Sequence, residues 1–242
     1  MEKVALVTGA SRGIGAAIAT RLAKDNFTVL VNYVGNSNAA ERLVNQIENA
    51  GGKAVSAQAD VSDIKAVSRL FESTEASFGG IDAVINSAGI MKLATLAECK
   101  EDDFDKLVAV NFKGTFNIMR KAGKHLRQDG RIINLSSSVV GLNMPTYGIY
   151  AATKAAVEAL TQVMSKELRG RNITVNAVAP GPTATELFLD GKSDEVVSNL
   201  AKLSPLERLG NPEDIANTVA FLAGEQGAWI NGQVIRANGG II

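Results

Sequence analysis

Short apolar segments alternate with longer helical segments along the whole chain. Four of the apolar segments lie at residues 4–7, 28–31, 83–85 and 131–135, and none alternates strictly between apolar and polar positions. Such strands are typical of a parallel sheet that helices cover on both faces. The strand–helix unit recurs about seven times at roughly 30 residues per repeat, the size of a right-handed βαβ unit. We therefore predict an α/β fold with a doubly wound, parallel, seven-stranded sheet of Rossmann type.

The segments between the strands show the periodicity of amphipathic helices. Six helices are expected, at residues 14–24, 39–50, 64–78, 102–126, 151–168 and 212–222. No linker or change of composition interrupts the pattern, so residues 1–242 are expected to form a single domain. The least regular stretch, 183–210, follows a predicted strand and is expected to be a substrate loop.

The charges of the chain balance, with 25 Lys plus Arg and 25 Asp plus Glu. A nucleic acid or anionic membrane usually requires a basic excess, so we expect a small-molecule partner. The single cysteine, Cys99, and single histidine, His125, exclude an intrachain disulfide and a zinc site of the usual His/Cys type, and no metal is expected. No apolar run reaches membrane-spanning length, and the chain begins directly with a strand pattern, so a cytoplasmic protein is expected.

A glycine-rich loop, TGASRGIG at residues 8–15, follows the first predicted strand and leads into a helix. Gly9 suits a tight turn, Gly13 lets a pyrophosphate approach the backbone, and Gly15 lets the helix pack closely on the sheet. This position predicts a dinucleotide site, with an ordinary strand-to-helix turn as the alternative. The expected contacts from the loop are Gly9, Ser11, Arg12, Gly13, Ile14 and Gly15.

The end of the second strand indicates which dinucleotide binds. An acid there would hold the adenosine ribose of NAD, but this strand ends in Asn32 and Tyr33, and the next acid is Glu41. Arg12 offers a guanidinium group to a 2′-phosphate. These residues favour NADP(H). The alternative is that Arg12 only pairs with a surface acid.

Tyr150 and Lys154 form a second candidate group of functional residues. On a helix, residues four apart share a face, so the phenol and the ammonium group can meet in one site. A neighbouring cation favours the phenolate and would bring the tyrosine pKa toward the working range. An amphipathic helix also produces this spacing by chance. Tyr147 has Ala151 four residues later and is not expected to act in this way.

Taken together, these features resemble the short-chain dehydrogenase/reductase family, in the form of its beta-ketoacyl carrier-protein reductase-like members. The resemblance covers essentially the whole chain. Besides the glycine loop it rests on Asp60-Val61, Asn86-Ser87-Ala88-Gly89, Asn111, a serine near Val139-Val140-Gly141, Tyr150 with Lys154, Pro180-Gly181 with Thr183, and Asn238-Gly239-Gly240.

The resemblance implies a role for each matching residue. The implied dinucleotide contacts are Asp60 and Val61 at the adenine, Asn86, Ala88 and Gly89 along the molecule, and Pro180, Gly181 and Thr183 at the nicotinamide end. Tyr150 would exchange the proton, Lys154 would bind the nicotinamide ribose, and Asn111 would anchor a relay water. A serine would orient the carbonyl oxygen.

The chain departs from the family pattern in two places. The serine region, Ser136-Ser137-Ser138, is one residue longer than usual. Counting from Val139-Val140-Gly141 selects Ser138 as the orienting serine, whereas counting back from Tyr150 selects Ser137. We expect Ser138, because a bulge easily absorbs an extra residue at a strand end. Asn238 stands where many relatives carry Asp.

The expected function is hydride transfer between NADP(H) and a carbonyl or secondary alcohol, most simply reduction of a ketone, aldehyde or 3-oxoacyl substrate. The alternative is a catalytically idle NADP-binding sensor, which could dispense with Tyr150 and Lys154. Long helices with surplus apolar residues, such as Phe116, predict a homodimer or homotetramer, and the resemblance implies the same.

Overall fold

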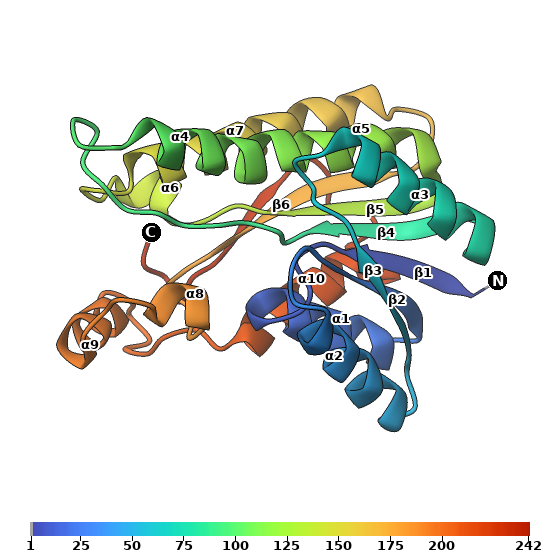
Figure 1. Ribbon diagram of the computed structural model, residues 1–242, viewed down its shortest axis with the longest axis horizontal. Coiled ribbons are helices and arrows are strands. Elements are labelled where there is room, and N and C mark those ends of the chain that lie inside the picture. The colour runs from blue at the N-terminus through green and yellow to red at the C-terminus, as the bar shows by residue number, and fades with distance from the viewer. Residues whose placement is uncertain (1) are drawn as a thin grey trace.

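A parallel sheet forms the middle layer of the computed structural model, which describes residues 2–242 (Figure 1). The strands are β1 Lys3–Val7, β2 Phe27–Tyr33, β3 Lys53–Gln58, β4 Ile81–Asn86, β5 Leu126–Leu135, β6 Thr174–Pro180 and β7 Val234–Ala237. They lie in the order β3-β2-β1-β4-β5-β6-β7, and every neighbouring pair is parallel. From β1 the next two strands are added on one side, and from β4 onward the strands are added on the other side, so the strand order changes direction between β1 and β4. The predicted seven-stranded, doubly wound sheet is confirmed.

Helices cover both faces of this sheet (Figure 1). On one face lie α1 Gly13–Lys24, α2 Ser37–Asn49 and α10 Pro212–Ala223, and on the other lie α3 Ile64–Phe78, α4 Glu101–Leu107, α5 Thr115–His125 and α7 Gly148–Glu167. The shorter elements are η1 Val108–Gly114, α6 Val139–Leu142, α8 Glu186–Leu189, α9 Asp194–Lys202 and η2 Glu225–Gly227.

Successive side chains of β1 explain why its sequence is continuously apolar. Ala5 and Val7 belong to the core cluster that packs under α1, α2 and α10. Val4 and Leu6 belong to a second cluster under α3 and α5. Neighbouring residues of a strand point to opposite faces, and here both faces are buried, so an alternating apolar pattern would place polar groups in one of the cores.

The single helix predicted over 102–126 is divided in three. It begins as α4, continues as the π-helix η1, and resumes as α5. A π-helix widens the backbone by one residue per turn and is frequent at functional sites. Here it contains Asn111, which is fully buried. The hydrophobic periodicity of the segment does not reveal such a local change of hydrogen bonding.

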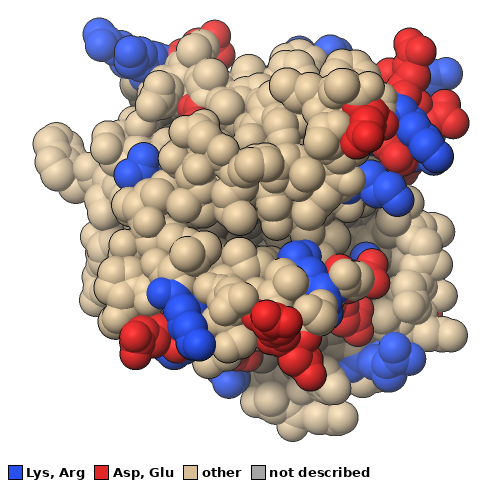
Figure 2. All heavy atoms as spheres, turned by 90° about the vertical axis from the view of Figure 1, so that its left-hand side faces the viewer, with Lys and Arg blue, Asp and Glu red and all other residues tan. Residues whose placement is uncertain are grey.

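The stretch predicted as a substrate loop leaves the carboxyl end of β6 and contains the two short helices α8 and α9. Both project beyond the sheet on the side where its strands end (Figure 1). Figure 2 looks at this side of the molecule, where charged side chains gather mostly toward the rim and uncharged atoms fill much of the middle. No helix within residues 2–242 is both long enough and apolar enough to cross a membrane.

Candidate active site

A cleft of about 620 Å³ opens at the carboxyl ends of the strands. Its walls come from the segments after β1, β2, β3, β4, β5 and β6, together with the start of α7 and the helices α8 and α9. Open parallel sheets bind ligands where the strand order changes direction, and this cleft includes that point between β1 and β4. Most of the residues expected at a dinucleotide site line it, namely Gly9, Ser11, Arg12, Gly13, Ile14, Gly15, Asn32, Tyr33, Asp60, Val61, Ala88, Gly89, Tyr150, Lys154, Pro180, Gly181 and Thr183.

The glycine loop packs too tightly for side chains at two of its positions. A Cβ atom on Gly9 would lie 2.7 Å from the Cα of Ala88, and one on Gly15 would lie 2.5 Å from the carbonyl oxygen of Gly9. The hydroxyl of Thr8 accepts hydrogen bonds from the amides of Ser87 and Ala88 and so joins the ends of β1 and β4. These contacts hold the loop against the base of the cleft.

The N-terminus of α1 is suited to an anion. Arg12 occupies the N-cap position, and no side chain accepts a hydrogen bond from the first amides of the helix. The first turn also contains no acidic residue. Free amides and the positive end of the helix dipole favour a phosphate group at this position. The residues at this end of the cleft therefore fit the pyrophosphate of a dinucleotide.

The side chain of Asn32, which was expected to contact the dinucleotide from the end of β2, forms hydrogen bonds with the main chain of the protein. It is 1% exposed, and its side-chain amide donates hydrogen bonds of 3.1 Å to the main-chain oxygens of Ala57 and Ala59. Its side-chain oxygen accepts a 3.4 Å hydrogen bond from the amide of Gly9. The carboxamide therefore fixes β2, β3 and the glycine loop to one another.

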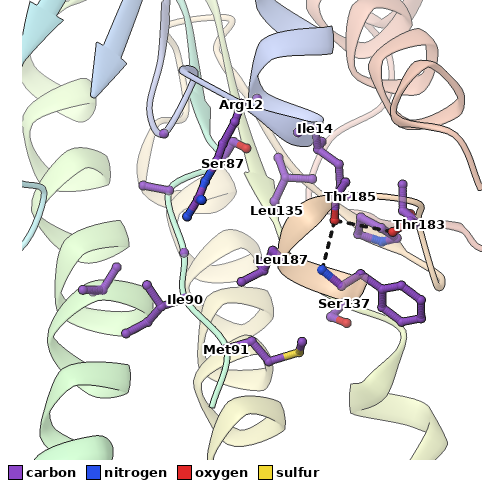
Figure 3. A pocket seen from close by; sticks show the side chains of 18 of the residues that line it. Arg12, Ile14, Ser87, Ile90, Met91, Leu135, Ser137, Thr183, Thr185 and Leu187 are labelled. Carbon is purple, nitrogen blue, oxygen red and sulfur yellow. Dashed lines mark hydrogen bonds between the residues drawn. The ribbon is translucent and has the colours of Figure 1, made fainter. Parts of the chain in front are cut away.

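Arg12 reaches from the glycine loop along the cleft (Figure 3). Its Nη1 atom lies 3.4 Å from a carboxylate oxygen of Glu186 in α8, and both side chains are largely exposed. The surface acid that was an alternative partner for Arg12 is thus present, and it belongs to the substrate-loop segment. Gly35 and Asn36 line the same end of the cleft, and Asn36 caps α2 by accepting from the amide of Ala39.

Asn86 does not line the cleft, contrary to expectation. Its side-chain amide donates a 2.7 Å hydrogen bond to the side-chain oxygen of Asn134, and the Asn134 amide donates to the hydroxyl of Thr161 at 2.9 Å. This buried chain links β4, β5 and α7. The neighbouring Ser87 lines the cleft instead.

Tyr150 and Lys154 lie on the same face of α7, as their spacing predicted. The Lys154 Nζ atom is 5.8 Å from the centre of the Tyr150 ring and donates a 2.7 Å hydrogen bond to the main-chain oxygen of Leu135. Burial lowers the pKa of Lys154 to about 8. The ammonium group is thus held between the end of β5 and the phenol.

The pKa of Tyr150 moves in the direction opposite to the expected one. Burial raises it to about 12, a hydrogen bond with Ser137 partly offsets this increase, and the nearby Tyr147 adds to it. The expectation that Lys154 would lower this pKa is corrected, because the loss of solvation at the buried phenol outweighs any effect of the cation.

Both serines left open by the count, Ser137 and Ser138, line the cleft, and Ser137 is the one that acts on the Tyr150 phenol. Ser138 is 2% exposed; its hydroxyl donates to the main-chain oxygen of Ala179 at 3.3 Å and accepts from the side-chain amide of Asn238 at 3.0 Å. Its main-chain amide donates to Pro180. Both polar groups of Ser138 are therefore engaged with β6 and Asn238. The Ser137 hydroxyl accepts from the amide of Val139 at 3.4 Å, and its side chain acts to lower the Tyr150 pKa.

Asn111 lies behind the cleft instead of lining it. Its carboxamide forms two 2.9 Å hydrogen bonds with the main chain of Ile90, one accepted from the amide and one donated to the carbonyl oxygen. It also donates to the hydroxyl of Thr153 at 3.3 Å, and that hydroxyl donates to the carbonyl oxygen of Tyr150 at 2.7 Å. The side chain that was expected to anchor a relay water is thus used to position the cleft wall and the first turn of α7.

Further, mostly apolar residues close the cleft on the side of Ser137 and Tyr150. They comprise Ile90, Met91, Leu142, Met144, Tyr147 and Leu200, together with Leu187 and Phe188 from the segment predicted to be a substrate loop. Figure 3 shows Met91, Ile90 and Leu187 at this end of the pocket. They come from separate loops and short helices, and no sequence motif unites them.

Comparison with known proteins agrees with this geometry. Residues 9–242 match the family model described as enoyl-(acyl carrier protein) reductase. A short-chain type dehydrogenase/reductase from Picea abies is 45% identical over 248 residues, which cover 98% of this chain and 92% of that protein. The 3-oxoacyl-[acyl-carrier-protein] reductase FabG of Staphylococcus aureus is 43% identical over 243 residues, covering all of this chain and 98% of the relative.

A solved structure extends the comparison to three dimensions. The angucycline C-6 ketoreductase LanV with bound NADP superimposes with a TM-score of 0.93 at 38% sequence identity, covering 99% of this chain and 95% of that one. Together with the glycine loop, the Tyr150–Lys154 pair and the adjacent serine in one cleft, these likenesses show that the chain belongs to the short-chain dehydrogenase/reductase family of oxidoreductases.

Proposed function

We propose that the protein reduces the carbonyl group of a neutral ketone, aldehyde or 3-oxoacyl compound, with NADPH as the reductant. The observation that supports this most directly is the meeting of Ser137, Tyr150 and Lys154 in the cleft whose other end is the glycine loop. A bound nicotinamide dinucleotide would supply the hydride at this site. The idle sensor considered above is not favoured, because it would need neither the phenol nor the serine.

In this proposal the protein's own residues handle the carbonyl oxygen. The Tyr150 hydroxyl donates its proton to that oxygen as negative charge develops there, and Ser137 donates a second hydrogen bond. Lys154 holds a hydroxyl of the nicotinamide ribose. The phenol remains protonated over the whole working range, because burial raises its pKa to about 12. It is therefore always ready to donate in the reductive direction.

The preference for NADPH is supported by charge at the adenosine end. No carboxylate occupies the end of β2, since Asn32 stands there, and Arg12 lies in the cleft. A 2′-phosphate would pair with the Arg12 guanidinium in place of Glu186. Asn36, at the N-terminus of α2, is a second group close enough to the same region to assist.

Replacing Tyr150 by phenylalanine tests the chemical part of the proposal. We expect the rate of NADPH oxidation with a carbonyl substrate to fall by about 100-fold or more, the usual contribution of a positioned acid. NADPH binding, measured by quenching or enhancement of cofactor fluorescence, should stay within about twofold of wild type. Equal turnover by both proteins would show that Tyr150 is not the proton donor.

We also propose that the protein is cytoplasmic, which its single cysteine is consistent with. We further propose that copies of this chain associate. Phe116 on α5 and Val163 on α7 are 42% and 54% exposed, and Trp229 is 99% exposed, so Trp229 is not a core residue of the single chain. Apolar groups that one copy leaves in water favour contact with another. Light scattering at micromolar concentration should give a multiple of 25.4 kDa, and a mass of one chain would contradict the proposal.

A further inference from the structure

A short hydrogen bond joins the end of β5 to α7 at the back of the cleft. The hydroxyl of Ser136, the first residue after β5, donates to a carboxylate oxygen of Glu158 on α7 at 2.6 Å. This is the length of a charge-assisted hydrogen bond, one of the stronger kinds in proteins. Neither residue has a part in the reaction as described so far.

Ser136 is held from two sides. It is 3% exposed although it lines the cleft, and its amide donates to the main-chain oxygen of Val178 in β6 at 2.8 Å. Its hydroxyl also lies 3.5 Å from the main-chain oxygen of Lys154. A hydroxyl has a single proton, so the much shorter contact with Glu158 decides where that proton points.

The side chain of Glu158 is committed to this contact. Glu158 is half-buried, and within residues 2–242 its carboxylate forms this hydrogen bond and no ion pair. A glutamate on a helix commonly pairs with a cation four residues away. The cation at that spacing is Lys154, whose ammonium group donates to Leu135 instead. Glu158 is therefore used to hold the end of β5.

The peptide group between Leu135 and Ser136 connects Glu158 to the reacting centre. Its carbonyl oxygen accepts the 2.7 Å hydrogen bond from the Nζ atom of Lys154. Lys154 and Glu158 are one turn apart on α7, so two side chains of one helix hold the same peptide group. One binds its oxygen, and the other binds the serine that follows. A shift of Ser136 would move the oxygen that holds the ammonium group.

We propose that Glu158 is a positioning residue, which acts through Ser136 to fix the Leu135 carbonyl oxygen and thereby the ammonium group of Lys154. It does not line the cleft, so it acts without touching cofactor or substrate. The position of Lys154 matters because misplacing a reacting or binding group by about 1 Å can lower a rate severalfold or more. This inference rests on the proposed function, because it takes Lys154 as the group that holds the nicotinamide ribose beside Tyr150.

Glu158→Met and Glu158→Gln form a matched pair of variants. Both replacements are close to glutamate in length, suit a helix and remove the charge, but only glutamine keeps an oxygen that can accept from Ser136. In Glu158→Met the Kd for NADPH should rise by about 3-fold to 10-fold and kcat should fall by about 10-fold, because Lys154 is no longer fixed. Glu158→Gln should recover most of both losses. Fluorescence titration with NADPH and the rate of NADPH oxidation give the two quantities.

Three further variants test the route of the effect. Ser136→Ala should reproduce Glu158→Met, and the two changes together should be no worse than either alone, since both remove the same hydrogen bond. In a Lys154→Met protein, adding Glu158→Met should leave the Kd for NADPH unchanged, because the effect passes through Lys154. Glu167→Met removes an exposed carboxylate from the last position of α7 and should match wild type, which controls for the lost charge.

The outcomes separate this inference from the proposed function. The inference is wrong if Glu158→Met lowers the free energy of unfolding while Kd and kcat keep their wild-type values. It is also wrong if Glu158→Met weakens NADPH equally with and without Lys154, or if Glu158→Gln is as impaired as Glu158→Met. Should Glu158→Met fail to fold, Ser136→Ala carries the same comparisons. A wild-type protein that binds NADPH but reduces no carbonyl compound overturns the proposed function, while the Kd comparisons still decide the inference.

Discussion

The side-chain amide of Asn238 donates a 3.0 Å hydrogen bond to the hydroxyl of Ser138. Because the same hydroxyl donates to Ala179, the Ser138 side chain is bound to two neighbouring segments, although the residue lines the cleft. The C-terminal segment thus fixes the turn that presents the preceding residue, Ser137, to Tyr150. The serine region is one residue longer than usual, and Ser138, whose hydroxyl bonds Ala179 and Asn238, accounts for the extra residue.

The two serines should respond differently to replacement by alanine. Ser137→Ala should lower kcat by about 10-fold to 100-fold with little effect on unfolding, because it removes a hydrogen bond made at the reacting oxygen. Ser138→Ala should instead lower the free energy of unfolding by about 1–3 kcal/mol, because Ala179 loses its buried donor. Steady-state kinetics and urea unfolding of both variants make the comparison. If Ser138→Ala is fully folded and loses more kcat than Ser137→Ala, Ser138 is the serine that orients the carbonyl oxygen, as the sequence analysis expected.

Arg12→Ala should weaken NADPH selectively. A charge-assisted hydrogen bond is worth roughly 1.5–3 kcal/mol, so the ratio of kcat/KM for NADPH to that for NADH should fall by about 10-fold to 100-fold. Glu186→Gln should shift the ratio the other way by a smaller factor, since it releases Arg12 from an exposed ion pair of little strength. A ratio unaffected by Arg12→Ala would transfer the phosphate contact to another group, with Asn36 the next to replace.

Asn32→Asp should destabilise the protein in addition to any effect on cofactor choice. The substitution replaces the amide that donates to Ala57 and Ala59 by an oxygen that cannot donate, and it places negative charge beside two carbonyl oxygens. We expect the free energy of unfolding to fall by about 1–3 kcal/mol or more. Urea denaturation measures this. Unchanged stability would mean that the side chain is free to turn toward the ribose.

Lys154→Met should show a stability difference from wild type that depends on pH. The pKa of Lys154 is about 8 in the folded chain and near 10.5 when unfolded, so between these values the unfolded state binds the extra proton. Wild-type stability therefore rises with pH across this window relative to the variant. We measure Tm of both proteins without nucleotide and subtract the wild-type value from that of Lys154→Met. This difference should be highest below pH 8 and should fall steadily between pH 8 and pH 10.5. A difference that stays constant with pH would mean that Lys154 is not desolvated.

The sequence alone determined the fold and most of the cofactor end of the site. Apolar strands such as β1 require two cores, and the glycines at positions 9, 13 and 15 mark a tight turn from a strand into a helix. These signals are local, since a strand, a turn and a helix start lie within a few residues of one another. The spacing of Tyr150 and Lys154 is local for the same reason, being one turn of a helix.

Only the tertiary structure decided how the polar side chains are used. Asn32, Asn86 and Asn111 all stand at strand or helix positions near the cleft, yet each directs its carboxamide to a main-chain or side-chain partner that is distant in sequence. Ser138 is likewise bound by Asn238, 100 residues away. Sequence shows which groups can form hydrogen bonds but not which partners the packing of separate elements brings within reach, because buried polar groups pair with whatever the folded chain places beside them.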